Sequence, residues 1–313
     1  MNKKTKHDYI KLAKHFLQVR LIDKGIAVTP KNIKQALIIS APDYRPNYWR
    51  RLRCALVTQQ REAGFTKAAD IIKETCNPVT DNTASEELKA QKKAKQARRK
   101  HVEKEEHLLL KNHLRMKGDL YLTAMIELAR ILGCRPVEMM TLQVSGDNQI
   151  IITGAKKRED GLRGLDGTVK LSPKDFDAAN RARSILFEYR SIRGLTEEQL
   201  QKRLQRRLAT ATKKLWPRRK HHITLYSYRH QMGSDLKASG RSSEKIAAIM
   251  GHQSVDSVDV YGNKRRSSRH LSIRATDASI AHVRKTTPKN PEFMATKKRR
   301  MISIVTAFLK PEW

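Results

Sequence analysis

Cysteine is scarce in this 313-residue chain. Its three cysteines, Cys54, Cys76 and Cys134, form no Cys-x-x-Cys pair and no metal-ligand spacing, so neither a disulfide scaffold nor a zinc site is indicated. Long apolar runs are also missing. No stretch approaches the roughly eighteen apolar residues of a transmembrane helix, and residues 1–8 lack the apolar core of a signal peptide. We therefore expect a soluble cytoplasmic protein without a membrane partner.

Acidic side chains are few as well. The chain has 31 Asp and Glu residues against 65 Lys and Arg, which gives a formal net charge of +34. Such an excess is typical of a protein that lies along a polyanion. A membrane-surface protein could share this charge, but the charge fits nucleic acid equally well. The composition therefore supports a polyanion such as DNA as the partner class.

One stretch has the residue types that could cut a phosphodiester bond. The chain reads Tyr226-Ser-Tyr-Arg229-His, continues to Gly251-His252, and has Tyr261 nine residues after that histidine. Cleavage without a metal needs cations on the non-bridging oxygens, an acid for the leaving oxygen and a side-chain oxygen that attacks. Arg229, His252 and Tyr261 are suitable for these tasks, so no cofactor or metal is expected.

The spacing in this stretch predicts two short helices and a turn. Ser227 is placed to cap a helix that carries Arg229 in its first turn and ends at Gly240. A second helix should end at Gly251, a glycine stop that leaves His252 just past the helix end. A last short turn then presents the tyrosine.

This stretch resembles the catalytic motif of the tyrosine recombinases, the phage integrase family. In that family an Arg on a helix, a Gly-His pair and a Tyr nine residues later form the carboxyl half of the site. This chain departs from the family at Tyr226, which stands where the family usually has the histidine of His-x-x-Arg. A phenol can donate a hydrogen bond to phosphate, but it accepts a proton less readily than imidazole at neutral pH. Tyr226 could preserve the geometry while weakening base catalysis.

An upstream stretch resembles the family's first box. Residues 118–132 have apolar positions at helical spacing, and then follows Gly133-x-Arg135-x-x-Glu138-x-x-x-Leu142. The resemblance implies that Arg135 touches the scissile phosphate and that Glu138 helps to fix the fold. Arginine suits this task because its planar fork gives two parallel hydrogen bonds to phosphate and keeps its charge.

The resemblance also implies a general-acid lysine on a β-hairpin between the two boxes. The apolar run 149–153 and the segment 168–171 are predicted to pair as strands. Lys156 and Lys157 both follow the first strand, and we favour Lys156 because Lys156-x-Arg158 is similar to a Lys-x-Arg often seen in the family. A mobile amine beside a phosphate can donate a proton to the leaving 5′ oxygen.

The predicted fold is mainly α-helical with a small β-hairpin or sheet, divided into an N-terminal helical domain and a mixed α+β catalytic domain. Helical patterns cover residues 9–21, 30–39, 48–63 and 68–72, and the resemblance implies that residues 1–76 form a core-binding domain that clamps DNA. Around Trp49, four arginines either contact phosphate or form a solvated helix face; they are Arg45, Arg50, Arg51 and Arg53.

Residues 77–106 are predicted to be a linker, with an exposed basic helix over residues 86–106 that either follows the DNA backbone or is simply solvated. The catalytic domain is expected over residues 107–270. Residues 271–313 are expected to be a basic tail, in which the apolar segment 301–309 could form a helix that docks on a neighbouring protomer or folds back on its own domain.

The function that the resemblance implies is site-specific DNA strand exchange, as in an integrase of a mobile genetic element. The expected partners are double-stranded DNA recombination sites and further copies of the chain, which would assemble as a tetramer on the DNA. The expected catalytic residues are Arg135, Lys156, Tyr226, Arg229, His252 and Tyr261. Other readings remain open at this point: a hairpin-forming telomere resolvase, a relaxing topoisomerase of type IB, and a DNA-binding accessory protein that has the fold but not the chemistry.

Overall fold

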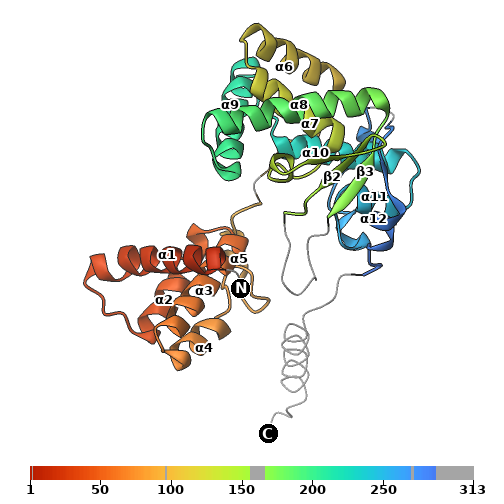
Figure 1. The fold of residues 1–313 in the computed structure, drawn as a ribbon. Coiled ribbons are helices and arrows are strands. Elements are labelled where there is room, and N and C mark those ends of the chain that lie inside the picture. The colour runs from red at the N-terminus through yellow and green to blue at the C-terminus, as the bar shows by residue number, and fades with distance from the viewer. Residues whose placement is uncertain (2, 96, 156–165, 269–270, 287–313) are drawn as a thin grey trace. The chain divides into compact units, whose positions relative to one another are not determined.

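A computed structural model describes residues 1, 3–95, 97–155, 166–268 and 271–286 of the chain (Figure 1). Two compact units divide the chain, residues 1–97 and residues 98–313. Both units are predominantly helical, and the second also contains a small antiparallel sheet. The predicted fold class, mainly α with a small sheet, is confirmed. None of the helices in these described ranges is long and apolar enough to span a membrane.

The first unit is a bundle of helices over its described residues. Its helices are α1 (Lys3–Arg20), α2 (Pro30–Ile39), α3 (Pro46–Glu62), α4 (Thr66–Glu74) and the short α5 (Glu86–Ala90). Helix α2 begins as its sequence indicates, because Pro30 occupies its first turn and the Thr29 side chain accepts a hydrogen bond from the Asn32 backbone N–H at 3.2 Å. Trp49 is 2% exposed, and its indole N–H donates to the Leu37 carbonyl oxygen at 2.8 Å. Trp49 is therefore a core residue of this unit.

The predicted linker and its basic helix need correction. Helix α5 ends at Ala90, and the described residues between it and Lys104 form no helix. This segment has closely spaced like charges and no apolar stripe, so a helix here would gain little from packing. The linker is also shorter than residues 77–106, because Val79 packs in the core of the first unit and Val102 in that of the second.

The second unit contains seven α-helices in its described residues, and four of them pack around the apolar helix α7. The seven are α6 (Lys104–Met116), α7 (Leu120–Leu132), α8 (Pro173–Ile192), α9 (Glu197–Leu215), α10 (Leu225–Ala238), α11 (Ser243–Ile249) and α12 (Asp277–Ala281). Helix α7 contacts α6, α8, α9 and α10. In α9, Leu200, Leu204 and Leu208 recur every four residues and are all buried, which leaves the basic side chains of that helix on its outer face.

The described residues of the second unit also form a four-stranded antiparallel sheet in the order β1-β2-β3-β4. Its strands are β1 (Gln143–Ser145), β2 (Gln149–Ile152), β3 (Gly167–Lys170) and β4 (Arg274–Ala275). The predicted hairpin corresponds to β2 and β3, which pair in a register that sets Ile150 opposite Val169. Both of these side chains are buried, so the register places one face of the hairpin on the core.

Strand β4 corrects the expected end of the catalytic domain. Residues 271–275 were expected to belong to a tail, but Leu271 and Ile273 are buried in the core of the second unit and β4 pairs with β3. Helix α12 then packs against α11. The domain therefore continues past residue 270, because the edge of β3 and the adjoining apolar surface need a cover. The segment 301–309 and the basic residues 297–300 lie outside the described residues.

Candidate active site

Helix α10 carries Arg229 and begins one turn earlier than its sequence suggested. Its N-cap is Thr224, whose side chain accepts from the Ser227 backbone N–H at 3.2 Å, while the Thr224 backbone N–H donates to the Ser227 hydroxyl at 3.0 Å. This reciprocal pair is a capping box, so Ser227 lies at the third helical position and is not the cap itself. Arg229 consequently lies in the second turn, where its side chain points into the protein.

The guanidinium of Arg229 is completely buried and joins three parts of the second unit. It donates to the Gly133 carbonyl oxygen at 3.0 Å, to the Met250 carbonyl oxygen at 2.6 Å and to Nε2 of His252 at 2.9 Å. Burial, reinforced by the nearby Arg135, lowers the pKa of Arg229. Its Nε has no hydrogen-bond partner among the described residues. A buried donor of this kind is suited to an incoming anion, because an acceptor would offset its desolvation.

His252 follows the glycine that ends the second of the predicted helices. Gly251 has a φ of +60°, in the left-handed region that favours glycine, and His252 is buried directly after it. Arginine can only donate hydrogen bonds, so Nε2 of His252 must accept from Arg229. The neutral imidazole then carries its proton on Nδ1, an assignment that follows from the hydrogen-bond pattern.

The Tyr261 ring lies among three of these cationic or imidazole groups. Its centroid is 5.1 Å from the His252 ring, 4.9 Å from the His230 ring and 5.0 Å from the guanidinium carbon of Arg229. The turn that carries Tyr261 is held against α10, because a Cβ at Gly233 would lie 3.1 Å from the Tyr261 Cβ. Gly262 has a φ of +74° and packs its backbone onto the same helix.

Arg135 reaches the same place from the end of α7. Its guanidinium lies 3.3 Å and 3.4 Å from the Gly251 carbonyl oxygen through its two terminal nitrogens, and it donates to Glu138 at 2.6 Å. Glu138 is buried and also accepts from the Arg135 backbone N–H and from the Ala155 backbone N–H. Glu138 therefore holds the arginine and the end of β2 together. Lys156, Lys157 and Arg158 come next in the chain and lie outside the described residues.

Tyr226 is not brought into contact with the other candidates. Its side chain is 41% exposed, and among the described residues no hydrogen bond or ring contact links it to Arg135, Arg229, His252 or Tyr261. Tyr228, two positions on, is instead a core residue: it is buried, and its hydroxyl lies 3.1 Å from Nδ1 of His107. The catalytic assignment of Tyr226 stays a prediction.

We predict that Tyr226→Phe loses most of the cleavage rate, because the phenol hydroxyl is the group that can donate to a phosphate oxygen in place of the usual imidazole. Tyr226→His should recover at least part of the rate. Both variants are compared with the parent in single-turnover cleavage at saturating DNA. Equal rates for Tyr226→Phe and the parent would show that the hydroxyl has no part in catalysis.

Sequence reasoning missed His230, whose ring lies 4.9 Å from the Tyr261 ring at a tilt of 34°. Burial, together with the nearby cations Lys100, Arg229 and Arg98, lowers the pKa of His230 to about 4. This imidazole is therefore neutral near pH 7. Its position directly after Arg229 was the only available signal, and adjacency in a helix does not indicate which ring it faces.

The residues in the described ranges contain no group of three His, Cys, Asp or Glu side chains that could hold a metal ion. The arrangement gathers Arg135 and Arg229, two histidines and the Tyr261 ring. Two guanidinium groups can hold the non-bridging oxygens of a phosphate, and a tyrosine oxygen beside them can attack phosphorus.

Comparison with known proteins places the chain in a family. The model of the phage integrase family matches residues 100–267, more than half of the chain, and the protein belongs to that family. No curated protein sequence matches the chain. Among solved structures, it is similar to a lambda integrase tetramer bound to a Holliday junction, with 16% identity, a TM-score of 0.51, and coverage of 85% of this chain and 73% of that one.

A second similar structure is the Tn1549 transposon integrase in complex with a circular intermediate DNA. It has 12% identity and a TM-score of 0.51, and the match covers 84% of this chain and 90% of that one. At these identities the likeness concerns the fold. Together with the family match it confirms the resemblance that the two arginine boxes and the Gly-His-to-Tyr interval indicated.

Proposed function

We propose that the protein is a site-specific DNA strand transferase that works through a covalent tyrosine intermediate. The observation that carries this proposal is the convergence of Arg135, Arg229 and His252 around the Met250 and Gly251 carbonyl groups, with the Tyr261 ring against them. These residues come from the end of α7, from α10 and from the turns after α11. The packing of these elements against one another does not require a hydroxyl group on the Tyr261 ring.

In the proposed reaction Tyr261 gives up its hydroxyl proton to solvent as its oxygen attacks the scissile phosphorus and forms a 3′-phosphotyrosyl bond, while the bond from phosphorus to the 5′ oxygen breaks. Lys156 donates a proton to that leaving oxygen. Arg135 and Arg229 hold the negative charge on the phosphorane, and His252 is held by Arg229 beside the same atoms. The free 5′ hydroxyl of a partner strand then attacks phosphorus and releases the tyrosine. The bond energy is conserved in the protein linkage.

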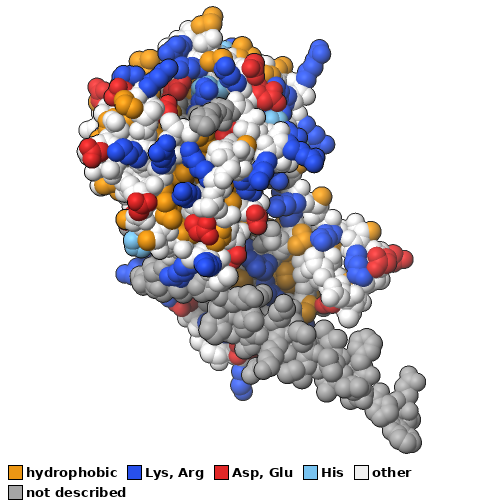
Figure 2. All heavy atoms as spheres, turned by 90° about the vertical axis from the view of Figure 1, so that its right-hand side faces the viewer, with side chains coloured by type: hydrophobic (Ala, Val, Ile, Leu, Met, Phe, Trp, Pro, Cys, Tyr) orange, Lys and Arg blue, Asp and Glu red, His pale blue; other side chains and the backbone are white. Residues whose placement is uncertain are grey.

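Several features support DNA as the substrate. The net charge of +34 favours a polyanion, and Lys and Arg side chains are spread over the face shown in Figure 2. The bundle of residues 1–97 would serve as the core-binding domain. The similar lambda integrase structure is a tetramer on a Holliday junction, so we extend to this chain the proposal of a tetramer on paired duplex sites.

The experiment that tests this function is to incubate the protein with DNA that flanks its own coding sequence and to map covalent attachment points after denaturation. Attachment through the 3′ phosphate at defined positions, followed by recombinant joints between two sites, is the expected result. Plasmid relaxation without joints would favour a topoisomerase, and hairpin ends would favour a telomere resolvase. Binding without any attachment would identify an accessory protein with this fold.

The segment after residue 295 supplies a further prediction. Its apolar positions follow a basic tract in the sequence, which suits docking on another protomer. Deleting residues 296–313 should leave binding to a single DNA site largely intact but reduce higher-order complexes and recombination. Gel-shift titration of the full and shortened chains distinguishes the two effects. If the shortened chain assembles on DNA as the full chain does, the assembly contacts lie elsewhere.

A further inference from the structure

A pocket of about 600 Å³ lies beside the candidate active site in the second unit. Its lining comes from three segments and from α10: residues 98–101, residues 219–221, and residues 259–266, which include the turn directly after Tyr261. His230 and Ser234 provide the α10 wall. Since the ring of His230 also contacts Tyr261, the pocket and the candidate nucleophile share one wall.

The pocket is strongly basic. Among its described lining residues, Asp259 is the sole carboxylate. Arg98, Lys100 and Lys220 also line it, are exposed, and have no ion-pair partner among the described residues. Burial, followed by the nearby Arg99 and Arg266, lowers the pKa of His101 in the same wall. The cations that contribute, after burial, to the lowered pKa values of His101 and His230 would also attract an anion.

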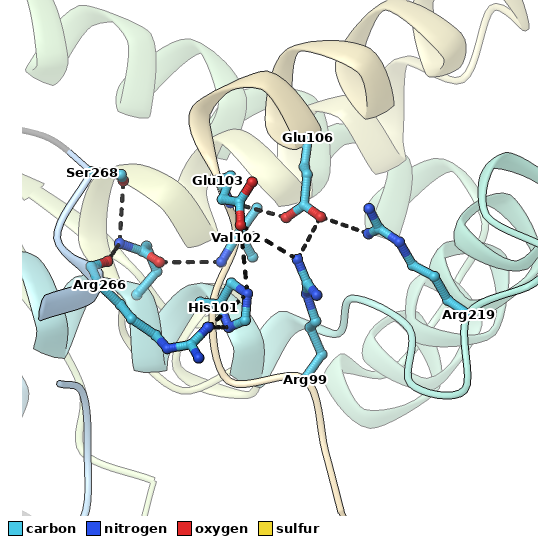
Figure 3. A network of polar contacts seen from close by, with 9 residues as sticks. Arg99, His101, Val102, Glu103, Glu106, Arg219, Arg266 and Ser268 are labelled. Carbon is cyan, nitrogen blue, oxygen red and sulfur yellow. Dashed lines mark hydrogen bonds and ion pairs between the residues drawn. The ribbon is translucent and has the colours of Figure 1, made fainter.

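The remaining arginines of the pocket hold its walls in place (Figure 3). Arg99 donates to the buried carboxylate of Glu106 at 2.5 Å, and Arg219 forms an ion pair with the same carboxylate at 2.6 Å. Although burial opposes its ionisation, the Glu103 backbone N–H and Arg99 lower the pKa of Glu106. On the other side, Arg266 lies 2.9 Å from a ring nitrogen of His101. Residues 98–101 are thus fixed to two neighbouring segments.

Gln231 of α10 joins the same walls from behind. Its side-chain oxygen accepts from the Val102 backbone N–H at 3.1 Å, and its side-chain nitrogen donates to the Arg266 carbonyl oxygen at 2.7 Å. The same nitrogen lies 3.1 Å from the Ser268 hydroxyl (Figure 3). The segment before α6 and the segment after Tyr261 are therefore held together before any ligand arrives. Preformed sites bind at a smaller cost in ordering.

We propose that this pocket is a second phosphate site, which holds a phosphodiester group of the cut strand next to the scissile one. Each strand of a duplex has one phosphate per about 3.4 Å of helix axis, so a strand with one phosphate at Tyr261 must place the next ones close by. Arg98, Lys100 and Lys220 are the residues that would contact it. This proposal rests on the proposed function. It adds a second point, next to the reacting phosphate, at which the protein holds the substrate strand.

The first test compares the salt dependence of duplex binding. The double variant Arg98→Gln/Lys220→Gln removes two unpaired cations from the pocket, and Lys117→Gln is the matched control because Lys117 is exposed and lies outside the pocket lining. The slope of log K against log salt should become shallower by about 0.9, the value for one phosphate contact, in the double variant only. An unchanged slope, or an equal change in the control, overturns the proposal.

The second test locates the phosphate. After covalent attachment has been mapped, single phosphodiesters beside the scissile position are replaced by uncharged methylphosphonates. One replacement should weaken binding of the parent by several-fold and leave binding of the double variant nearly unchanged, because the cations that read that charge are already gone. A penalty of equal size in both proteins overturns the proposal.

The third test concerns the class of anion. Polyglutamate at matched charge should displace duplex DNA from the parent poorly compared with competing duplex DNA. If polyglutamate displaced the duplex as well as competing DNA does, the pocket would take acidic proteins, and the phosphate assignment would be overturned. Equilibrium binding gives its result whether or not cleavage occurs. If the pocket tests overturn the second phosphate site but Tyr261-dependent attachment is intact, the proposed function still stands. If the parent shows no covalent attachment, that result alone refutes the proposed function.

Discussion

Tyr261→Phe should abolish covalent protein–DNA attachment and leave DNA binding nearly unchanged. The phenyl ring would keep its contacts with His230, His252 and Arg229, since these involve the ring face and not the hydroxyl. The substitution removes the one atom that can attack phosphorus in the proposed reaction. Denaturing gels that retain protein-linked DNA measure attachment, and equilibrium titration under native conditions measures binding.

Tyr228→Phe is the matched control, because Tyr228 lies on α10 close to the site in sequence. Tyr228 is buried against His107, so its hydroxyl is not available to DNA and its loss should leave attachment intact in a folded protein. If attachment persists in Tyr261→Phe, the nucleophile has been misassigned. The exposed Tyr226 would then be the next candidate.

Arg135→Ala and Arg229→Ala should each slow cleavage by on the order of 100-fold or more, the scale for losing one donor that stabilises the transition state. The two arginines approach the Met250-Gly251 backbone from different elements, which places both of them beside the candidate phosphate position. Single-turnover cleavage at saturating DNA separates this effect from weaker binding. A parental rate in either variant would show that its box has been misplaced.

Both variants should also lose stability, each for its own reason. Arg229 is fully buried and satisfies the Gly133 and Met250 carbonyl oxygens, so its removal leaves buried acceptors unpaired at a cost of roughly 1–3 kcal/mol each. Arg135→Ala leaves the buried carboxylate of Glu138 without the guanidinium that pairs with it, so this variant should lose stability as well. Thermal unfolding of both variants, and of Arg135→Lys and Arg229→Lys as charge-retaining controls, separates lost catalysis from lost folding.

A large part of this protein could be predicted from local sequence patterns. The glycine stops at Gly133 and Gly251 and the Thr29-Pro30 start of α2 act over a few residues, and each lies where its pattern indicated. The β2–β3 hairpin follows from an apolar β-branched run and a partner strand. The two arginine boxes and the interval from His252 to Tyr261 could also be recognised from the sequence, because each is a short pattern of residue types.

Other features were decided by contacts between residues far apart in the chain. The hydrogen bonds of Arg135 with Gly251 and of Arg229 with Gly133 join residues about a hundred positions apart. No local sequence pattern predicts these contacts. The pairing of β4 with β3 likewise follows from an open sheet edge that only the packed domain possesses. Which ring His230 faces depended on the approach of the Tyr261 turn to α10.

The sequence by itself therefore determined the family, the helical class and the residue types of the candidate site, because helix caps, glycine stops and apolar periodicity act within a few residues of each other. Only the tertiary structure decided that Tyr226 is exposed and apart from the other candidates. It also decided that residues 98–103 form no helix and are hydrogen-bonded to α10, and that a basic pocket adjoins Tyr261. These outcomes depend on how separate segments pack, and the free energy of packing is shared among residues that the chain order keeps apart.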